Sequence, residues 1–115
     1  MAESNPHFVV YESNRPRSCR SKLRTEVMLE LRSGVRIKTR TIDASLGGCY
    51  PEMTDALPIG TEARVYLTHR NQIFTATGNV VRSKRNTGIA IKFRVVECSQ
   101  LPILQEWLFA LERLE

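Results

Sequence analysis

Apolar residues recur at every second position over most of the chain, and this alternation constrains the fold more than any other feature of the sequence. Segments near residues 26–31, 35–41, 61–69, 72–83 and 88–96 show it. A period of two is typical of β-strands that bury one face and expose the other. Turn signals such as Ser33 and Gly34 separate the segments, which favours antiparallel hairpins.

The pattern changes to a helical period near residue 99. In SQLPILQEWLFALERLE, leucines recur at the spacing of one helix face, and Ser99 is suitable as the N-cap. We therefore expect an amphipathic α-helix at about 99–114 that covers one end or face of the sheet. The chain is predicted to be mainly β, with five or six antiparallel strands followed by this helix, and closure into a barrel would remove exposed sheet edges.

The length of 115 residues suits one domain with a single core. No apolar run reaches the roughly 18 residues of a membrane-spanning helix, and the N-terminus lacks a signal-peptide pattern, so we expect a cytoplasmic protein without membrane insertion. The three cysteines are odd in number and widely spaced, which fits neither a disulfide framework nor a zinc site. We expect no metal and no cofactor.

The residues also argue against an enzyme. Only His7 and His69 are available as histidine bases, and the chain offers no Ser-His-Asp set, no paired carboxylates beside a base and no phosphate-binding glycine loop. Nucleic-acid binding is disfavoured too, because aromatic residues are 7% of the chain and most occupy core-like positions. A binding module is the remaining class.

Residues 1–24 are predicted to form a flexible arm that precedes the barrel domain at 25–115. A short apolar patch at 8–11 would be a strand or a surface anchor. The segment RPRSCRSKLR at 15–24 holds five cations and no acid. Arginine forks bind phosphate in a bidentate manner, so this segment is suited to a phosphorylated ligand.

The stretch TIDASLGGCY at 41–50 follows a strand-like run and contains Asp43, Ser45, Gly47 and Gly48. One interpretation is a turn, because Asp and Ser bond nearby backbone and glycine permits positive φ. The other is a ligand site, in which the aspartate accepts hydrogen bonds from the N1–H and amine of guanine. With the cationic arm, the pattern favours a phosphorylated guanine compound over a plain polyanion, which Asp43 would repel.

These features together resemble the PilZ domain family. The resemblance rests on the arginine-rich segment 15–24, on DASLGG at 43–48, on LPIGTEARVYL in the middle of the chain and on GNVVRSKRNTGIAIKF at 78–93. It implies a six-stranded antiparallel β-barrel with a C-terminal helix. It also implies binding of the bacterial second messenger cyclic di-GMP by an R-x-x-x-R arm and a D-x-S-x-x-G turn, which Asp43, Ser45 and Gly48 match.

The register of the arm stays open. Arg20 and Arg24 match R-x-x-x-R, but the usual distance to the first strand places the second arginine at Arg20. The first position then falls on Pro16, and a shift of one residue would put Arg15 or Arg17 in its place. The predicted site therefore comprises Arg15, Arg17, Arg20, Arg24, Asp43, Ser45, Gly47 and Gly48. A receptor of this size would signal to a partner protein by a conformational change, and the alternative is an adaptor that binds proteins without nucleotide.

Overall fold

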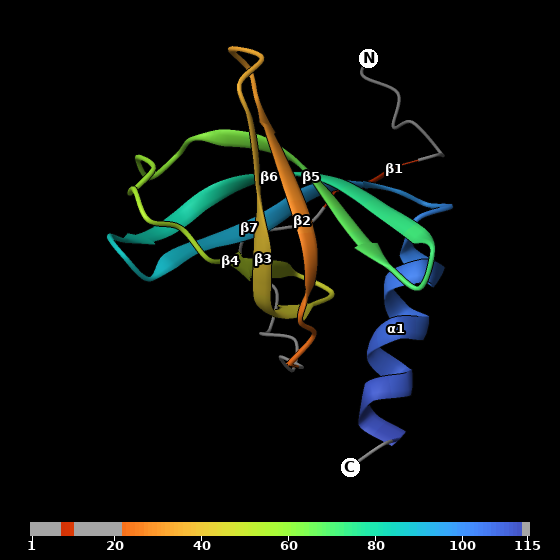
Figure 1. The fold of residues 1–115 in the computed structure, drawn as a ribbon. Coiled ribbons are helices and arrows are strands. Elements are labelled where there is room, and N and C mark those ends of the chain that lie inside the picture. The colour runs from red at the N-terminus through yellow and green to blue at the C-terminus, as the bar shows by residue number, and fades with distance from the viewer. Residues whose placement is uncertain (1–7, 11–21, 114–115) are drawn as a thin grey trace, which may run out of the picture.

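The computed structural model describes residues 8–10 and 22–113 of the chain. Within these residues the chain forms seven β-strands and one α-helix (Figure 1). The elements are β1 (Phe8–Val10), β2 (Thr25–Leu31), β3 (Arg36–Ser45), β4 (Gly48–Pro51), β5 (Glu62–His69), β6 (Gln72–Lys84), β7 (Gly88–Glu97) and α1 (Leu101–Arg113). With 13 residues, α1 is too short to cross a membrane, and no other helix occurs in these two ranges.

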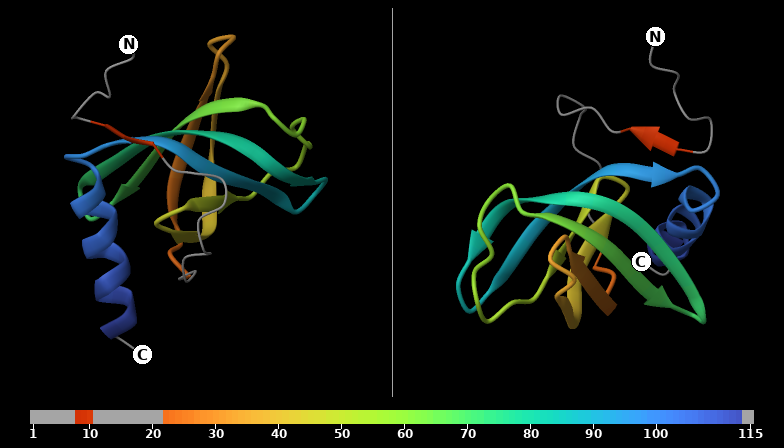
Figure 2. Two further views of the ribbon diagram at one scale, coloured as in Figure 1. Left: turned by 180° about the vertical axis from the view of Figure 1, so that it is seen from behind. Right: turned by 90° about the horizontal axis from the view of Figure 1, so that it is seen from above.

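Six of the strands close into a barrel. The order is β7-β4-β3-β2-β5-β6, every pairing is antiparallel, and the pairing of β6 with β7 completes the ring. This confirms the predicted six-stranded barrel with a C-terminal helix. The seventh strand, β1, lies outside the ring along β7, with Phe8 opposite Glu97 (Figure 2). The apolar patch near residue 8 is thus a strand over Phe8–Val10, whereas the flexibility predicted for residues 1–24 concerns mainly residues outside the described ranges.

The alternating residues fill the barrel as the sequence predicts. On β5, Ala63, Val65 and Leu67 are buried, and on β6 the buried residues include Phe74 and Val80. The rings of Phe74 and Phe93 pack against each other with centroids 5.4 Å apart. The alternation therefore reports the inner face of each strand correctly wherever the ladder is regular.

A β-bulge in β7 reverses the alternation near the end of that strand. Gly78 pairs with Phe93 while Thr77 pairs with Val95, so one step on β6 matches two steps on β7 and Arg94 is the extra residue. An extra residue shifts every later side chain to the other face. The interior residue is therefore Val96, which is 1% exposed, whereas the strict alternation predicted over 88–96 would place Val95 on the same face as Phe93; that prediction is wrong at this end of the strand.

Helix α1 starts two residues later than the sequence predicts. The first helical carbonyl is that of Gln100, which accepts hydrogen bonds from the N–H groups of Ile103 and Leu104. Gln100 rather than Ser99 is therefore the N-cap residue. Its side-chain Oε1 accepts a hydrogen bond of 3.0 Å from the N–H of Thr75 on β6, which fixes the start of the helix to the barrel.

The helix packs against the end of the β5–β6 hairpin, below which it runs in Figure 1. Trp107 is 2% exposed, and its indole Nε1–H donates to Oε1 of Gln72 at 3.2 Å. The ring of His69 meets that of Trp107 edge to face, with centroids 5.2 Å apart. Leu104 and Leu108 complete the buried stripe, so Trp107 is a core residue.

Candidate ligand site

The candidate site lies at the end of β3, where a bulge turns Asp43 to the outside of the barrel. Thr41 pairs with Pro51 and Ala44 pairs with Cys49, so three steps on β3 match two on β4. Thr41 and Ala44 are both buried, which leaves the two residues between them, Ile42 and Asp43, on the outer face. In a regular strand Asp43 would point into the core, so the bulge is what presents the carboxylate to solvent.

The side chain of Thr41 holds this bulge together. Thr41 is 1% exposed, and its hydroxyl donates a hydrogen bond of 2.8 Å to the carbonyl of Asp43 and accepts one of 3.2 Å from the N–H of Tyr50. These bonds replace ladder bonds that a bulge interrupts. Thr41 was not among the predicted site residues, although its inward position in the alternating run of β3 was a usable signal.

Ser45 and Gly47 form hydrogen bonds that stabilise the turn after the bulge. Ser45 pairs with Gly48 across a hairpin loop of two residues, and Ser45 Oγ accepts the N–H of Gly47 at 3.1 Å. The carbonyl of Gly47 accepts a hydrogen bond of 2.8 Å from the N–H of Phe93 on β7. Ser45 is 8% exposed, so its hydroxyl orders the turn that follows Asp43.

Gly48 is required by close packing rather than by its φ angle. A Cβ atom at this position would lie 2.1 Å from the carbonyl oxygen of Ile91 on β7. The glycines with positive φ in the described part of the chain are Gly34 and Gly60. The expectation that the motif glycine supplies a positive φ is therefore wrong for Gly48, and its role is to let β4 approach β7.

The carboxylate of Asp43 is half-buried and has no hydrogen bond or ion pair with any residue of 22–113. Its charge reaches the neighbouring thiol of Cys49. Burial and, secondarily, the Asp43 carboxylate raise the pKa of Cys49 to about 12, against a smaller lowering by the hydrogen bond with Thr41. The thiol is thus neutral at physiological pH, and the carboxylate is the acceptor that this surface offers to a ligand.

Residues 22–24, the described end of the arginine segment, lie at the same end of the barrel. Thr25, the first residue of β2, pairs with Thr41, so the chain before it runs toward the bulge. Leu23 is 1% exposed and anchors this approach, while Arg24 next to it is exposed. Arg15, Arg17 and Arg20 lie outside the described residues. The structure thus brings Asp43, Ser45, Gly47 and Gly48 together and leaves the arm arginines as predictions.

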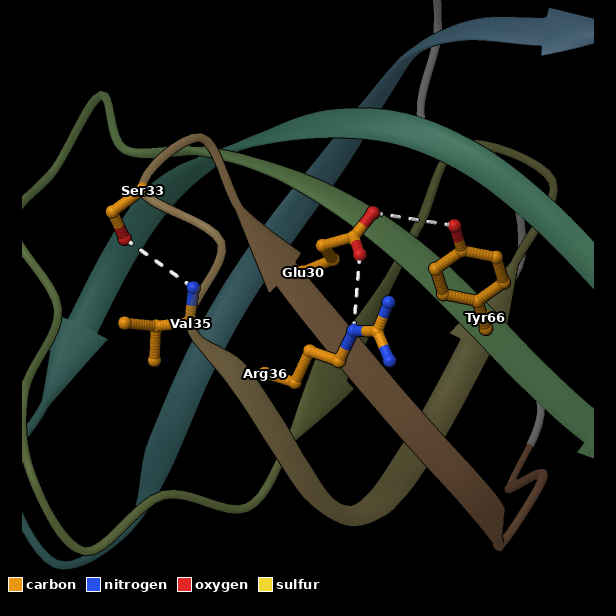
Figure 3. Close-up of polar contacts among 5 residues, drawn as sticks. All are labelled: Glu30, Ser33, Val35, Arg36 and Tyr66. Carbon is orange, nitrogen blue, oxygen red and sulfur yellow. Dashed lines mark hydrogen bonds and ion pairs between the residues drawn. The ribbon is translucent and has the colours of Figure 1, made fainter.

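A separate polar network lies at the other end of β3 (Figure 3). There the carboxylate of Glu30 accepts hydrogen bonds from Arg36 Nε at 3.1 Å and from the Tyr66 hydroxyl at 3.5 Å. In the adjoining turn, the N–H of Val35 contacts Ser33 Oγ at 3.5 Å. These contacts support the β2–β3 hairpin and its solvated face.

Residues 8–10 and 22–113 show no cluster of side chains that could hold a metal ion.

The sequence was also compared with known proteins. The family model of the PilZ domain matches residues 14–110, which is most of the chain. The chain belongs to the PilZ domain family. No curated protein sequence matches this PilZ domain significantly.

Solved structures with the same fold include other PilZ domains. The PilZ domain of CeSA from a cellulose-synthesizing bacterium has a TM-score of 0.66 and 20% identity, covering 83% of this chain and 99% of its own. The PilZ domain of YcgR from Escherichia coli, solved with c-di-GMP, has a TM-score of 0.65 and 22% identity, covering 87% and 93%. The inhibitor of motility MotI/DgrA from Bacillus subtilis has a TM-score of 0.71 and 14% identity, covering 89% of this chain and 53% of its own.

The family assignment confirms the resemblance inferred from the sequence. PilZ domains are non-catalytic and typically bind cyclic di-GMP, which supports the prediction that this PilZ domain is not an enzyme. At these identities the structural matches establish the fold and not the ligand. The residues that bind nucleotide in this chain therefore have to be argued from its own surface.

Proposed function

We propose that this PilZ domain is a cyclic di-GMP receptor. The observation that carries the proposal is the bulge that turns Asp43 outward. Without the bulge, the Asp43 carboxylate, which has no ion-pair partner among residues 22–113, would face the core. The family assignment and the similarity to a PilZ domain solved with c-di-GMP support it. A buried or paired aspartate at this position would have argued for a turn alone.

Each candidate residue has a defined role in the proposal. The Asp43 carboxylate accepts hydrogen bonds from the N1–H and exocyclic amine of a guanine. Ser45, Gly47 and Gly48 hold the turn on which Asp43 is presented. The Asp43 carboxylate repels the negatively charged phosphates of the ligand, so the phosphates must be bound by cations. In the proposal these cations are Arg20 together with Arg24, Arg15 or Arg17.

Binding would draw the arginine segment onto the barrel beside Asp43. The order that this segment gains is the conformational signal, and a partner protein reads it. A cytoplasmic location, where the messenger is found in bacteria, belongs to the same proposal. The predicted alternative is an adaptor that does not bind nucleotide. Its partner protein would bind equally well in the presence and absence of the messenger.

Calorimetric titration of cyclic di-GMP at about 150 mM salt tests the proposal. We expect the wild type to bind with micromolar or lower Kd, and we expect Arg20→Ala and Asp43→Asn each to lose most of the affinity. The matched controls are Arg85→Ala and Asp55→Asn, because both residues are exposed and lie outside the proposed site. Failure of the folded wild type to bind would reject the receptor and favour the adaptor.

The register of the arm is tested in the same titration. Arg24→Ala, Arg15→Ala and Arg17→Ala are compared with wild type. If Arg20 and Arg24 form the R-x-x-x-R pair, Arg24→Ala is as damaging as Arg20→Ala and the other two variants bind normally. If the pair is shifted toward the N-terminus, Arg15→Ala or Arg17→Ala is damaging instead and Arg24→Ala is mild.

A further inference from the structure

Tyr50 lies on the outer face of β4, directly opposite the bulge. Its neighbours Cys49 and Pro51 are both buried, so the Tyr50 side chain points outward, where it is half-buried. The residue pairs that flank the bulge leave Ile42 and Asp43 as the residues of β3 facing Tyr50. The outward acid and the outward aromatic ring therefore occupy adjacent positions on one face.

The other side of Tyr50 is formed by small residues of β7. A Cβ atom on Gly88 would lie 2.6 Å from Cε1 of the Tyr50 ring, so the ring rests on the backbone of Gly88. The pair of Cys49 with Ile91 places Ala90 opposite Tyr50, and Ala90 is 6% exposed. The ring is thus supported from the side of β7, where no bulky side chain separates it from the sheet.

The tyrosine hydroxyl has no hydrogen-bond partner among residues 22–113. Tyr66, the other outward tyrosine of the barrel within that range, uses its hydroxyl to contact Glu30. The Tyr50 hydroxyl, unlike that of Tyr66, is therefore not used to hold the barrel together, and the half-buried side chain is accessible from the outer face. An aromatic ring beside a carboxylate matches a purine that stacks by its face and donates from its edge, which is the chemistry of guanine.

We propose that Tyr50 is the stacking platform for one guanine base of cyclic di-GMP, whose Watson–Crick edge is bound by Asp43. This inference rests on the proposed function and assigns a residue outside the D-x-S-x-x-G and R-x-x-x-R motifs. A purely structural role for Tyr50, as a cover for Gly88, makes a different prediction. Any large apolar side chain would then preserve binding, whereas stacking requires an aromatic ring.

Titration of cyclic di-GMP into Tyr50→Phe and Tyr50→Leu separates the two roles. We expect Tyr50→Phe to bind within about twofold of wild type and Tyr50→Leu to bind roughly 5- to 150-fold more weakly, which is the range for loss of one base stack. Tyr66→Leu is the matched control, because it removes an outward tyrosine from β5, and it should bind as wild type does. Equal binding by Tyr50→Leu and wild type would overturn the inference and leave the receptor intact.

A second measurement does not depend on the stability of the leucine variant. Full-length protein labelled with 3-fluorotyrosine gives three fluorine signals, and the signal absent from Tyr50→Phe belongs to Tyr50. A base stacked on the ring changes the ring-current field at that signal, so it should shift on saturation while the Tyr66 signal stays in place. A wild type that binds nucleotide without this shift overturns the stacking role, and a wild type that binds none overturns both proposals.

Discussion

The hydroxyl of Thr41 donates a hydrogen bond of 2.8 Å to the backbone carbonyl of Asp43. A residue of the core thereby fixes the backbone that presents a surface acid. Burial matters here, because at 1% exposure water cannot replace the bond if the hydroxyl is removed. The position of the Asp43 carboxylate is thus determined from inside the barrel.

Replacing Thr41 by valine keeps the shape of the side chain and removes its hydrogen bonds with the Asp43 carbonyl and the Tyr50 N–H. We expect the free energy of unfolding to fall by about 1–3 kcal/mol, because the carbonyl of Asp43 and the N–H of Tyr50 lose a buried partner. Urea unfolding measures this, and the titration described above should show weaker nucleotide binding. Thr39→Val is the control, because the Thr39 hydroxyl also donates to a carbonyl, that of Glu52, but at an exposed position. Equal losses in both variants would contradict the role assigned to Thr41.

Gly48→Ala should be among the most destabilising single substitutions in the barrel. The added methyl would lie 2.1 Å from the Ile91 carbonyl oxygen, so β4 must separate from β7. We expect a loss of about 3 kcal/mol or more in urea unfolding, at the upper end of overpacking costs. Gly60→Ala is the comparison, because its methyl meets no atom within 4 Å and only its φ of +94° is strained, at about 1–2 kcal/mol. A smaller loss at Gly48 than at Gly60 would refute the close-packing argument.

Helix docking should weaken in acid because of His69. Burial and, to a smaller extent, the charge of Arg70 lower the pKa of His69 below its usual 6.5. A lowered pKa means that the folded state favours the neutral ring, so the stability is present above about pH 6.5 and is lost as pH falls toward the folded pKa. The Tm should drop between about pH 7.5 and pH 5. His69→Phe keeps an aromatic ring against Trp107 and should show a smaller drop; an unchanged drop would exclude His69 as the cause.

Cys49 should be unreactive toward thiol reagents in the folded protein at neutral pH. Its pKa of about 12 leaves almost no thiolate, and the side chain is buried. Cys98 is exposed and should react. In a Cys19→Ser background, we expect one thiol to react quickly and the second only in denaturant. Rapid reaction of two thiols in the native protein would show that the core around Cys49 opens to solvent.

The fold could be predicted from the sequence because burial on a strand has a period of two. That rule held for Ala63, Val65 and Leu67 and for β6 from Phe74 to Val80, where the ladder between β5 and β6 is regular. It failed after the bulges, since an extra residue moves the later side chains of that strand to the opposite face. Val96 replaces Val95 inside the barrel for this reason.

The candidate site was predictable in its residue identities and less so in their roles. Asp43, Ser45, Gly47 and Gly48 do lie together, as their spacing indicates. The neighbours that define the geometry are distant in sequence, however. The Ile91 carbonyl explains Gly48, and Gly88 supports Tyr50, because strands far apart in the chain meet only when the barrel closes. The roles of Arg15, Arg17 and Arg20 stay predictions.

The pairing of β1 with β7 has a consequence for the arginine-rich segment 15–24. Residues 11–24, which contain this segment, join Val10 to Thr25, and both of these residues are paired in the sheet, so the chain between them is held at both ends. Chain closure reduces the volume that a segment of given length can explore, and the entropy lost on ligand binding falls with it. The three-residue strand β1 thereby acts as a tether. In the proposed receptor, this tether would raise the local concentration of arginine near Asp43 through the connectivity of the chain alone.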